Sequence, residues 1–339
     1  MQGIDSLGVE KALQLFPDQI KECWKQAFSS NIPPVAPKSL VVSGMGGSSN
    51  AAKIIQSLYE AELKIPFMVY NDYGLPAWVN QDTLVVANSY SGNTEETLSS
   101  IEAANKAGTK ILGVTTGGKI AEMIKSGVIT GAIFNPGETN PTGFPKTALG
   151  ASFGALAGIL SKCGILPLSE EELIKSLDEL VENRKSWDAK EMAGWIHGSL
   201  PVLFGGRPFI GSLNAGRNAM CEISRNFTQF YDFPEVNHVL IEAMQKPDAA
   251  KSVKYLFFES SFNNDRVKLR YKVTKEILDE QKLEYRIYEL KGTTKLTQAL
   301  ELPYYCAWIG FYLSILDGSD PGPEPWILKL KESLSQPVH

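Results

Sequence analysis

Histidine and cysteine are scarce in this chain, and neither is arranged as a metal site or a disulfide framework requires. The 339 residues include only three histidines and four cysteines. The histidines form no HxH or HExxH pattern, so a three-histidine zinc site would need all of them, and we expect no metal cofactor. The cysteines are far apart and never spaced as CxxC, which predicts reduced thiols in a cytoplasmic protein. These residues are Cys23, Cys163, Cys221, Cys306, His197, His238 and His339.

Long apolar runs and an excess of positive charge are also missing. The longest apolar stretch, residues 148–160, is interrupted by three glycines and a serine and is too short to cross a bilayer. The first residues are polar, unlike a signal peptide. Lys and Arg total 33 against 38 Asp and Glu, a net charge of −5, which argues against nucleic-acid binding. We therefore expect a globular protein with neither membrane nor nucleic acid as its partner, although a local loop can still bind a small anion.

Apolar stretches and amphipathic segments alternate along the chain. This pattern predicts an α/β fold, with parallel sheets covered by helices on both faces. The length predicts two domains, which we expect at residues 1–165 and 166–339. A charged helix over 166–192 connects them, with Ser169 as its N-cap and Glu172 three residues later. The predicted strands are 39–42, 66–70, 83–87, 110–114, 130–134, 201–206, 255–258 and 285–288. The other predicted helices are 1–30, 51–60, 95–106, 148–160, 214–228, 267–281 and 302–316, the last with Pro303 in its first turn.

The two halves look like a degenerate repeat. A strand runs into a glycine-rich turn near residue 44 and again near 205. A strand runs into a Ser/Asn loop and a helix near residue 88 and again near 259. The second of these loops lacks the Gly-Asn-Thr of the first, so we expect one functional phosphate loop and one relic.

The hydroxyl-rich loop after residue 88 is the candidate phosphate site. Ser89, Ser91 and Thr94 open a predicted helix, where hydroxyls, backbone N–H groups and the helix dipole suit a phosphate monoester. The alternative is an ordinary N-cap, since Ser91-x-x-Thr94 fits a capping box. The glycine-rich turn at 44–49 favours the phosphate site, because two loops at one sheet edge form a crevice. A dinucleotide site is disfavoured because Ser49 replaces the third glycine of GxGxxG.

Several segments together resemble a known family. GMGGS at 44–48 and NSYSGNTEET at 88–97 resemble the SIS (sugar isomerase) domain. Within that group the chain is similar to the bifunctional phosphoglucose/phosphomannose isomerases, whose SYSGNT phosphate motif is present unchanged at 89–94. A PEVNH element ends at His238, and Glu222 lies 16 residues before that histidine, which is the spacing found in the family. PKTALG at 145–150 and the DP…IxxLKxxL pattern at 320–334 extend the resemblance over roughly residues 38 to 335.

The resemblance implies a homodimer with shared active sites and two flavodoxin-like SIS subdomains in each chain. It implies an isomerase that interconverts glucose 6-phosphate or mannose 6-phosphate with fructose 6-phosphate through a cis-enediolate, with no cofactor. Glu222 would be the base, His238 would reach the active site of the partner subunit, and Lys331 would lie near the ring oxygen. Lys146 stands in place of the family's arginine and would stabilise the enediolate. The substrate phosphate would be held by Gly47, Ser48, Ser89, Ser91 and Thr94.

Ordinary structural roles remain open for the same residues. Glu222 fits an ion pair with Arg225 three residues later, and Lys146 fits a surface lysine near a helix start. His238 fits a buried histidine held by its neighbours. For the whole chain, the alternatives are a sugar-phosphate-binding SIS protein without catalysis and an amino-sugar-phosphate isomerase or deaminase. The choice between glucose and mannose 6-phosphate is also open, because the two epimers differ only at C2.

Overall fold

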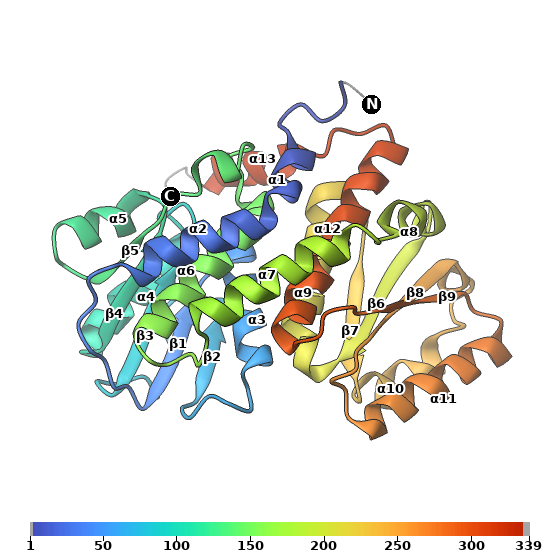
Figure 1. Ribbon diagram of the computed structural model, residues 1–339, viewed down its shortest axis with the longest axis horizontal. Helices are drawn as coiled ribbons and strands as arrows, with labels where there is room; N and C mark the ends of the chain where they lie inside the picture. The colour runs from blue at the N-terminus through green and yellow to red at the C-terminus, as the bar shows by residue number, and fades with distance from the viewer. Residues whose placement is uncertain (1–2, 335–339) are drawn as a thin grey trace.

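Two parallel sheets with helices packed around them form the scaffold of the computed structural model, which describes residues 3–334 (Figure 1). His339 lies outside these residues. The first sheet has the strand order β2-β1-β3-β4-β5 and the second has the order β7-β6-β8-β9, which confirms the predicted α/β class. The strands are β1 Ser39–Ser43, β2 Phe67–Tyr70, β3 Thr83–Asn88, β4 Lys110–Thr115, β5 Thr130–Ile133, β6 Leu200–Gly206, β7 Gln229–Phe233, β8 Val253–Glu259 and β9 Tyr285–Glu289.

The strand order explains where a ligand can bind. The order 2-1-3-4-5 is flavodoxin-like, and its direction of winding reverses between β1 and β3. These two strands run parallel, with Ser43 paired to Ala87 near their carboxyl ends. Ligands of open α/β sheets bind outside such a switch point. The second sheet repeats the order of the first four strands, as the predicted pseudo-repeat requires, with its own switch point between β6 and β8.

The helices follow the predicted pattern with some differences in their bounds. The segments predicted as single helices over 1–30 and 166–192 each contain two helices or parts of two, and α5, α10, α13 and β7 had no counterpart in the prediction. The helices are α1 Val9–Gln14, α2 Phe16–Phe28, α3 Gly46–Leu58, α4 Glu95–Lys106, α5 Gly118–Lys125, α6 Leu149–Lys162, α7 Glu170–Arg184, α8 Ala189–Ile196, α9 Ile210–Ser224, α10 Val236–Val239, α11 Asp265–Gln281, α12 Lys295–Leu316 and α13 Pro325–Leu334. Short 3₁₀ turns lie at Gly137–Thr139, Pro145–Thr147, Arg207–Phe209, Ile241–Ala243 and Asp248–Ser252.

Helix α12 begins at Lys295 rather than at residue 302, so the prediction that Pro303 lies in its first turn is wrong. The helix starts earlier because the Thr294 side chain caps it, its Oγ1 accepting from the Thr297 amide at 3.0 Å. Pro303 therefore lies in the helix interior, where it cannot donate to the Ala299 carbonyl four residues back. The Ser212 hydroxyl of α9 donates to that carbonyl instead, at 2.7 Å. A neighbouring helix thus satisfies the acceptor that proline leaves open.

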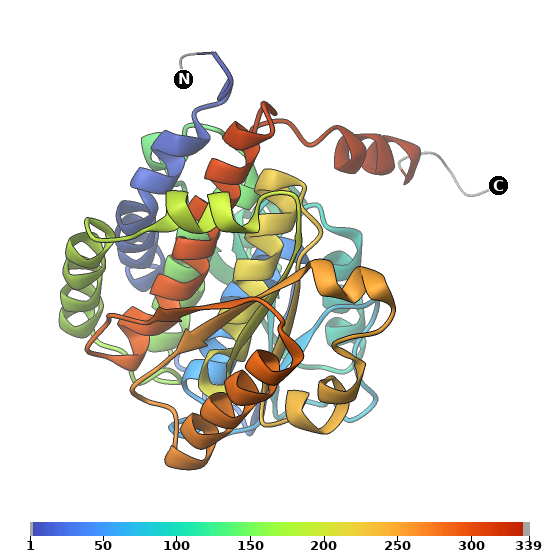
Figure 2. The same cartoon turned by 90° about the vertical axis from the view of Figure 1, so that its right-hand side faces the viewer.

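Of the three apolar core clusters in residues 3–334, one joins the two halves of the chain. It contains Val42 and Ile55 from the first half together with Met220, Leu256 and Ile309 from the second. Within the described residues, α12 alone is long and apolar enough to cross a bilayer, but 83% of that stretch is buried inside the fold. It is therefore a central core helix, which Figure 2 shows passing between other helices.

The small residues of α6 permit very close packing against α2. A Cβ added at Gly154 would lie 2.2 Å from the Ile20 carbonyl oxygen, so the two backbones are in contact. Gly150 and Gly158, one turn away on either side, also pack closely, since an added Cβ would lie 2.7 Å from the carbonyl oxygen of Phe16 or Trp24. The predicted buried helix rich in small residues is confirmed, and its glycines are a packing face.

The predicted N-cap of α7 is confirmed, and its contribution to stability can be tested. The Ser169 hydroxyl accepts from the Glu172 amide at 3.2 Å, and the Glu172 carboxylate accepts from the Ser169 amide at 3.0 Å. We expect Ser169→Ala to lower the free energy of unfolding by about 1 kcal/mol, measured by urea denaturation. Because the two side chains act together, Glu172→Ala should cost little more once Ser169 is gone. Fully additive losses in this double-mutant cycle would contradict the reciprocal cap.

Candidate active site

The predicted phosphate loop lies at the carboxyl end of β3 and is bound to the glycine-rich turn after β1. The Ser48 hydroxyl accepts from the Tyr90 amide at 3.0 Å, which joins the start of α3 to the loop. Within the loop, the Ser89 and Thr94 hydroxyls lie 2.7 Å apart, and the Gly92 amide donates to Ser89 Oγ at 3.1 Å. The two loops therefore share the switch point, as the sequence predicts.

The ordinary-cap alternative for this loop is wrong. Thr94 is the N-cap residue of α4, but its side chain accepts no hydrogen bond from the helix. It pairs with Ser89 instead. The Ser91 side chain is largely exposed and accepts only locally, from the Asn93 amide at 3.3 Å. With no side-chain cap, the first N–H groups of α4 are available to an anion.

The corresponding loop of the second sheet is filled by its own side chains. After β8, the Ser260 hydroxyl donates to Gln298 at 2.5 Å, and Asn263 donates to the Tyr271 hydroxyl at 3.2 Å. A Cβ at Gly206 would lie 2.0 Å from Asn263 Oδ1, so this switch point is packed closed. The closed loop after β8 fits the expected relic of the pair.

An asparagine cluster, which the sequence analysis missed, ties the phosphate loops to the helix that carries Glu222. Asn50 Oδ1 on α3 accepts from the amides of Asn214 and Asn218 on α9, each at 2.8 Å. Asn50 and Asn214 are buried. Asn214 and Asn218 are one turn apart, and Glu222 follows after another turn on the same helix. The sequence signal that could have revealed the cluster is the four-residue spacing of Asn214, Asn218 and Glu222, which places them on one face of the helix.

Glu222 lies half-buried in the last turn of α9. Burial raises the pKa of its carboxyl to about 7, and the nearby Glu324 carboxylate adds to that rise. Lys146, Arg217 and Lys331 act in the opposite direction but do not cancel it. A carboxyl with this pKa suits a general base at neutral pH.

Arg225 does not form the ion pair with Glu222 that the alternative interpretation requires. It adopts a left-handed backbone conformation, with φ 57°, immediately after α9. Its guanidinium donates to the carbonyls of Asp320 and Pro323, at 2.9 and 2.7 Å. Arg225 thus holds the segment between α12 and α13 against the end of α9.

Lys146 lies in the 3₁₀ turn Pro145–Thr147, and its side chain is only 1% exposed. The surface-lysine alternative is therefore wrong. Its Nζ donates to the Pro321 carbonyl at 2.8 Å and lies 3.8 Å from a Glu324 carboxylate oxygen. Burial lowers the pKa of this ammonium, and the Glu324 carboxylate opposes that shift. The turn also lies against the glycine-rich loop, because a Cβ at Gly47 would be 3.4 Å from the Pro145 carbonyl oxygen.

Arg217 is a further cation on α9 near Glu222. It donates to Asn214 Oδ1 at 3.1 Å, and its guanidinium lies 5.7 Å from the centre of the Phe230 ring. Its Nε is buried and has no hydrogen-bond partner. A buried unused donor beside a base is suited to bind a substrate oxygen.

His238 and Lys331 lie in different parts of the molecule. His238 is exposed on α10, so the alternative of a buried structural histidine is wrong. α10 lies at the lower edge in Figures 1 and 2, whereas α13, which carries Lys331, lies at the upper edge. Lys331 is exposed but is within electrostatic reach of Glu222. Among residues 3–334, no hydrogen bond or ion pair joins His238 to Glu222 or to the phosphate loop.

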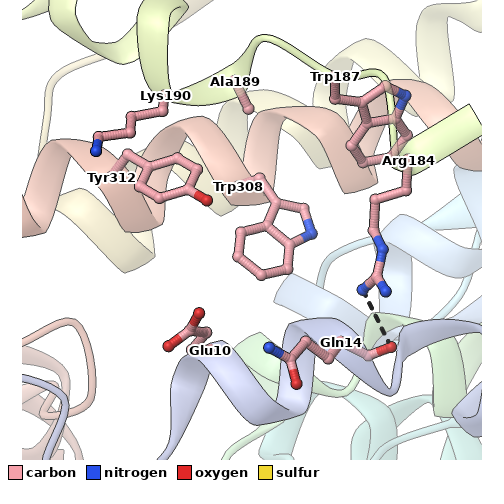
Figure 3. A pocket seen from close by; sticks show the side chains of 8 residues that line it. All are labelled: Glu10, Gln14, Arg184, Trp187, Ala189, Lys190, Trp308 and Tyr312. Carbon is pink, nitrogen blue, oxygen red and sulfur yellow. Dashed lines mark hydrogen bonds between the residues drawn. The ribbon is translucent and has the colours of Figure 1, made fainter.

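A pocket of about 300 Å³ lies elsewhere and contains none of the predicted site residues (Figure 3). It is lined by Glu10, Gln14, Arg184, Trp187, Ala189, Lys190, Trp308 and Tyr312. The cluster around Glu222 is the better candidate because it joins an acid of raised pKa, the buried Lys146 and the phosphate loop. No group of three or more His, Cys, Asp and Glu within residues 3–334 is placed to hold a metal ion.

Comparison with known proteins identifies the family of the chain. Residues 35–124 match the SIS domain, and residues 185–334 match the bacterial phospho-glucose isomerase C-terminal SIS domain. A bifunctional phosphoglucose/phosphomannose isomerase of Caldicellulosiruptor bescii is 30% identical over 94% of this chain and 97% of its own. One from Aquifex aeolicus is 31% identical over 88% of this chain and 91% of its own.

The fold recurs in solved structures. A tagatose-6-phosphate ketose/aldose isomerase from Escherichia coli superposes with a TM-score of 0.70 at 13% identity, over 94% of this chain and 96% of its own. At that identity the likeness concerns the fold alone. The family assignment rests on the two domain matches and on the sequence identity over nearly the full length of the chain. The chain belongs to the bifunctional phosphoglucose/phosphomannose isomerase family.

Proposed function

We propose that this chain is an aldose–ketose isomerase that interconverts glucose 6-phosphate, mannose 6-phosphate or both with fructose 6-phosphate, without a metal or other cofactor. The observation that carries the proposal is the setting of Glu222, a half-buried carboxyl whose pKa is raised to about 7 among cations. A base with this pKa is partly deprotonated at neutral pH and can both take and return a proton.

The reaction transfers one proton between neighbouring carbons. Glu222 takes the proton from C2 of the open-chain aldose. The C–H electron pair forms the C1=C2 double bond of a cis-enediolate, and the π pair of the C1 carbonyl moves onto the C1 oxygen. The proton of the C2 hydroxyl passes to the C1 oxygen, C2 becomes the carbonyl, and Glu222 returns its proton to C1. The buried Lys146 and the partly buried Arg217 stabilise the negative charge of the intermediate, since electrostatic stabilisation is strong where water is excluded.

The substrate phosphate binds at the switch point of the first sheet. The loops that precede α3 and α4 present hydroxyls and N–H groups there, and both helix dipoles favour an anion. Through Asn50, α3 holds α9 at a fixed distance, which sets the reach from phosphate to base. The residues assigned to the phosphate are Gly47, Ser48, Ser89, Ser91 and Thr94.

Ring opening is assigned to Lys331 and to His238 of a second copy of the chain. α10 is far from α13 within one chain, so His238 contributes only if a partner subunit brings it to the site (Figure 1). This is why the proposal includes a homodimer with shared active sites. The proposed subdomains are residues 1–165, with the phosphate loop, and residues 166–339, with Glu222 and His238.

The test is a coupled assay for fructose 6-phosphate formation from each aldose 6-phosphate in the presence of EDTA. We expect turnover of at least one substrate, and turnover of both would support the bifunctional assignment. If neither reacts while sugar phosphates still raise the melting temperature, the proposal fails, and a sugar-phosphate-binding protein or an amino-sugar-phosphate enzyme takes its place.

A further inference from the structure

Glu324 has no role in the function proposed above, yet it lies beside both of the charged groups that the reaction needs. Its side chain is 10% exposed and lies 3.8 Å from the Lys146 ammonium, which is itself 1% exposed. An ion pair so removed from water interacts more strongly than a surface pair. Glu324 precedes α13 and is distant in sequence from Lys146, so only the fold brings the two together.

The segment that carries Glu324 is held firmly in place. Lys146 donates to the carbonyl of Pro321, and Arg225 donates to those of Asp320 and Pro323. The Asp320 carboxylate also accepts from the Gly322 amide at 2.8 Å. With both cations bound to this stretch of backbone, Glu324 has little freedom to move away from Lys146.

A lysine needs such a partner in order to act at a fixed point. Its ammonium is a point charge on a flexible four-carbon stem, without the rigid fork of an arginine. The Pro321 carbonyl accepts a hydrogen bond from the ammonium, and the Glu324 carboxylate attracts it as an ion pair at 3.8 Å, so together they limit its position.

Glu324 also forms part of the charge surroundings of the base. The charged groups that face Glu222 are Glu324, Lys146, Arg217 and Lys331, and Glu324 is the one anion among these. Lys146 is faced by Glu324, Glu222, Asp320 and Arg225. Removal of the Glu324 charge therefore leaves Glu222 among cations and weakens its basicity.

We propose that Glu324 is a positioning residue of the isomerisation, which fixes the Lys146 ammonium and keeps a negative charge next to the Glu222 base. The inference rests on the proposed function for its kinetic consequences, but the charge coupling itself does not depend on turnover. Two readouts, one with substrate and one without, separate these two parts.

The substrate readout compares Glu324→Gln and Glu324→Asp with the wild type. We expect Glu324→Gln to lower kcat by about tenfold or more and to move the acid limb of the kcat/KM profile to lower pH by about half a unit or more. Glu324→Asp keeps the charge and should retain the wild-type acid limb. Glu280→Gln removes an exposed carboxylate of α11 and is the matched control, which should change neither quantity.

The readout without substrate is the ¹³C NMR titration of the Glu222 carboxyl carbon, with its signal assigned from Glu222→Gln. Its midpoint should fall in Glu324→Gln and stay unchanged in Glu280→Gln. An unmoved midpoint would overturn the inference, and so would equal losses of kcat in Glu324→Gln and Glu324→Asp with the wild-type acid limb. A moved midpoint in a wild type that turns over neither sugar phosphate would refute the proposed function and leave the charge coupling intact.

Discussion

Replacing Glu222 by glutamine should lower kcat for both proposed substrates on the order of 10³-fold, because a general base contributes about 10² to 10⁴ to such proton transfers. Glutamine has nearly the same shape as glutamate but cannot accept the C2 proton. Substrate binding should survive, since the phosphate loop on β3 and α4 is untouched. KM should change only a few-fold, measured by steady-state kinetics together with direct binding of the sugar phosphate.

The pH dependence provides a second signature of the same residue. Glu222 must be deprotonated to act, and the pKa of its carboxyl is raised to about 7. In the wild type, kcat/KM should therefore rise with pH through about 7 as the carboxyl loses its proton. The residual activity of Glu222→Gln should lack this limb. If Glu222→Gln kept activity within tenfold of the wild type, another residue would have to be the base.

Replacing Gly92 by alanine should raise KM for the sugar phosphate by roughly 10²-fold, because loss of one or two hydrogen bonds to a charged group costs about 3 kcal/mol. Gly92 has φ 70°, and an added Cβ would lie 1.8 Å from the Gly117 carbonyl oxygen. The atom it would strike is backbone, so the loop must move. That movement displaces Ser89 and Thr94 from the arrangement proposed to face the phosphate.

Gly108→Ala is the matched control for this substitution. Gly108 has a similar φ of 67°, but an added Cβ would meet nothing within 4 Å. Its replacement should cost about 1 kcal/mol of folding stability, from backbone strain alone, and leave KM unchanged. Equal KM values for the two variants would contradict a phosphate site at the loop.

Local sequence was sufficient where neighbouring residues determine the structure. Helix α4 spans Glu95–Lys106 as predicted. Its apolar residues follow the helical period, and Gly92 and Gly108 flank the segment. The Ser169 cap of α7 also depends on residues within one turn. The start of α12 was missed because apolar residues lie on every face of this buried helix, so the sequence shows only a weak helical period. β7 was missed because it is a partly exposed edge strand without a continuous apolar run.

The sequence by itself determined the α/β class, the repeat of two sheets and the phosphate motif, since each depends on residues that are close together along the chain. Only the tertiary structure decided the surroundings of Glu222, the proposed base. The pKa of Glu222 depends on burial and on Glu324, which lies in the connection after α12. Lys146 meets the Pro321 carbonyl across 175 positions of sequence. Electrostatic energy depends on distance and on exclusion of water, and both are properties of the folded chain.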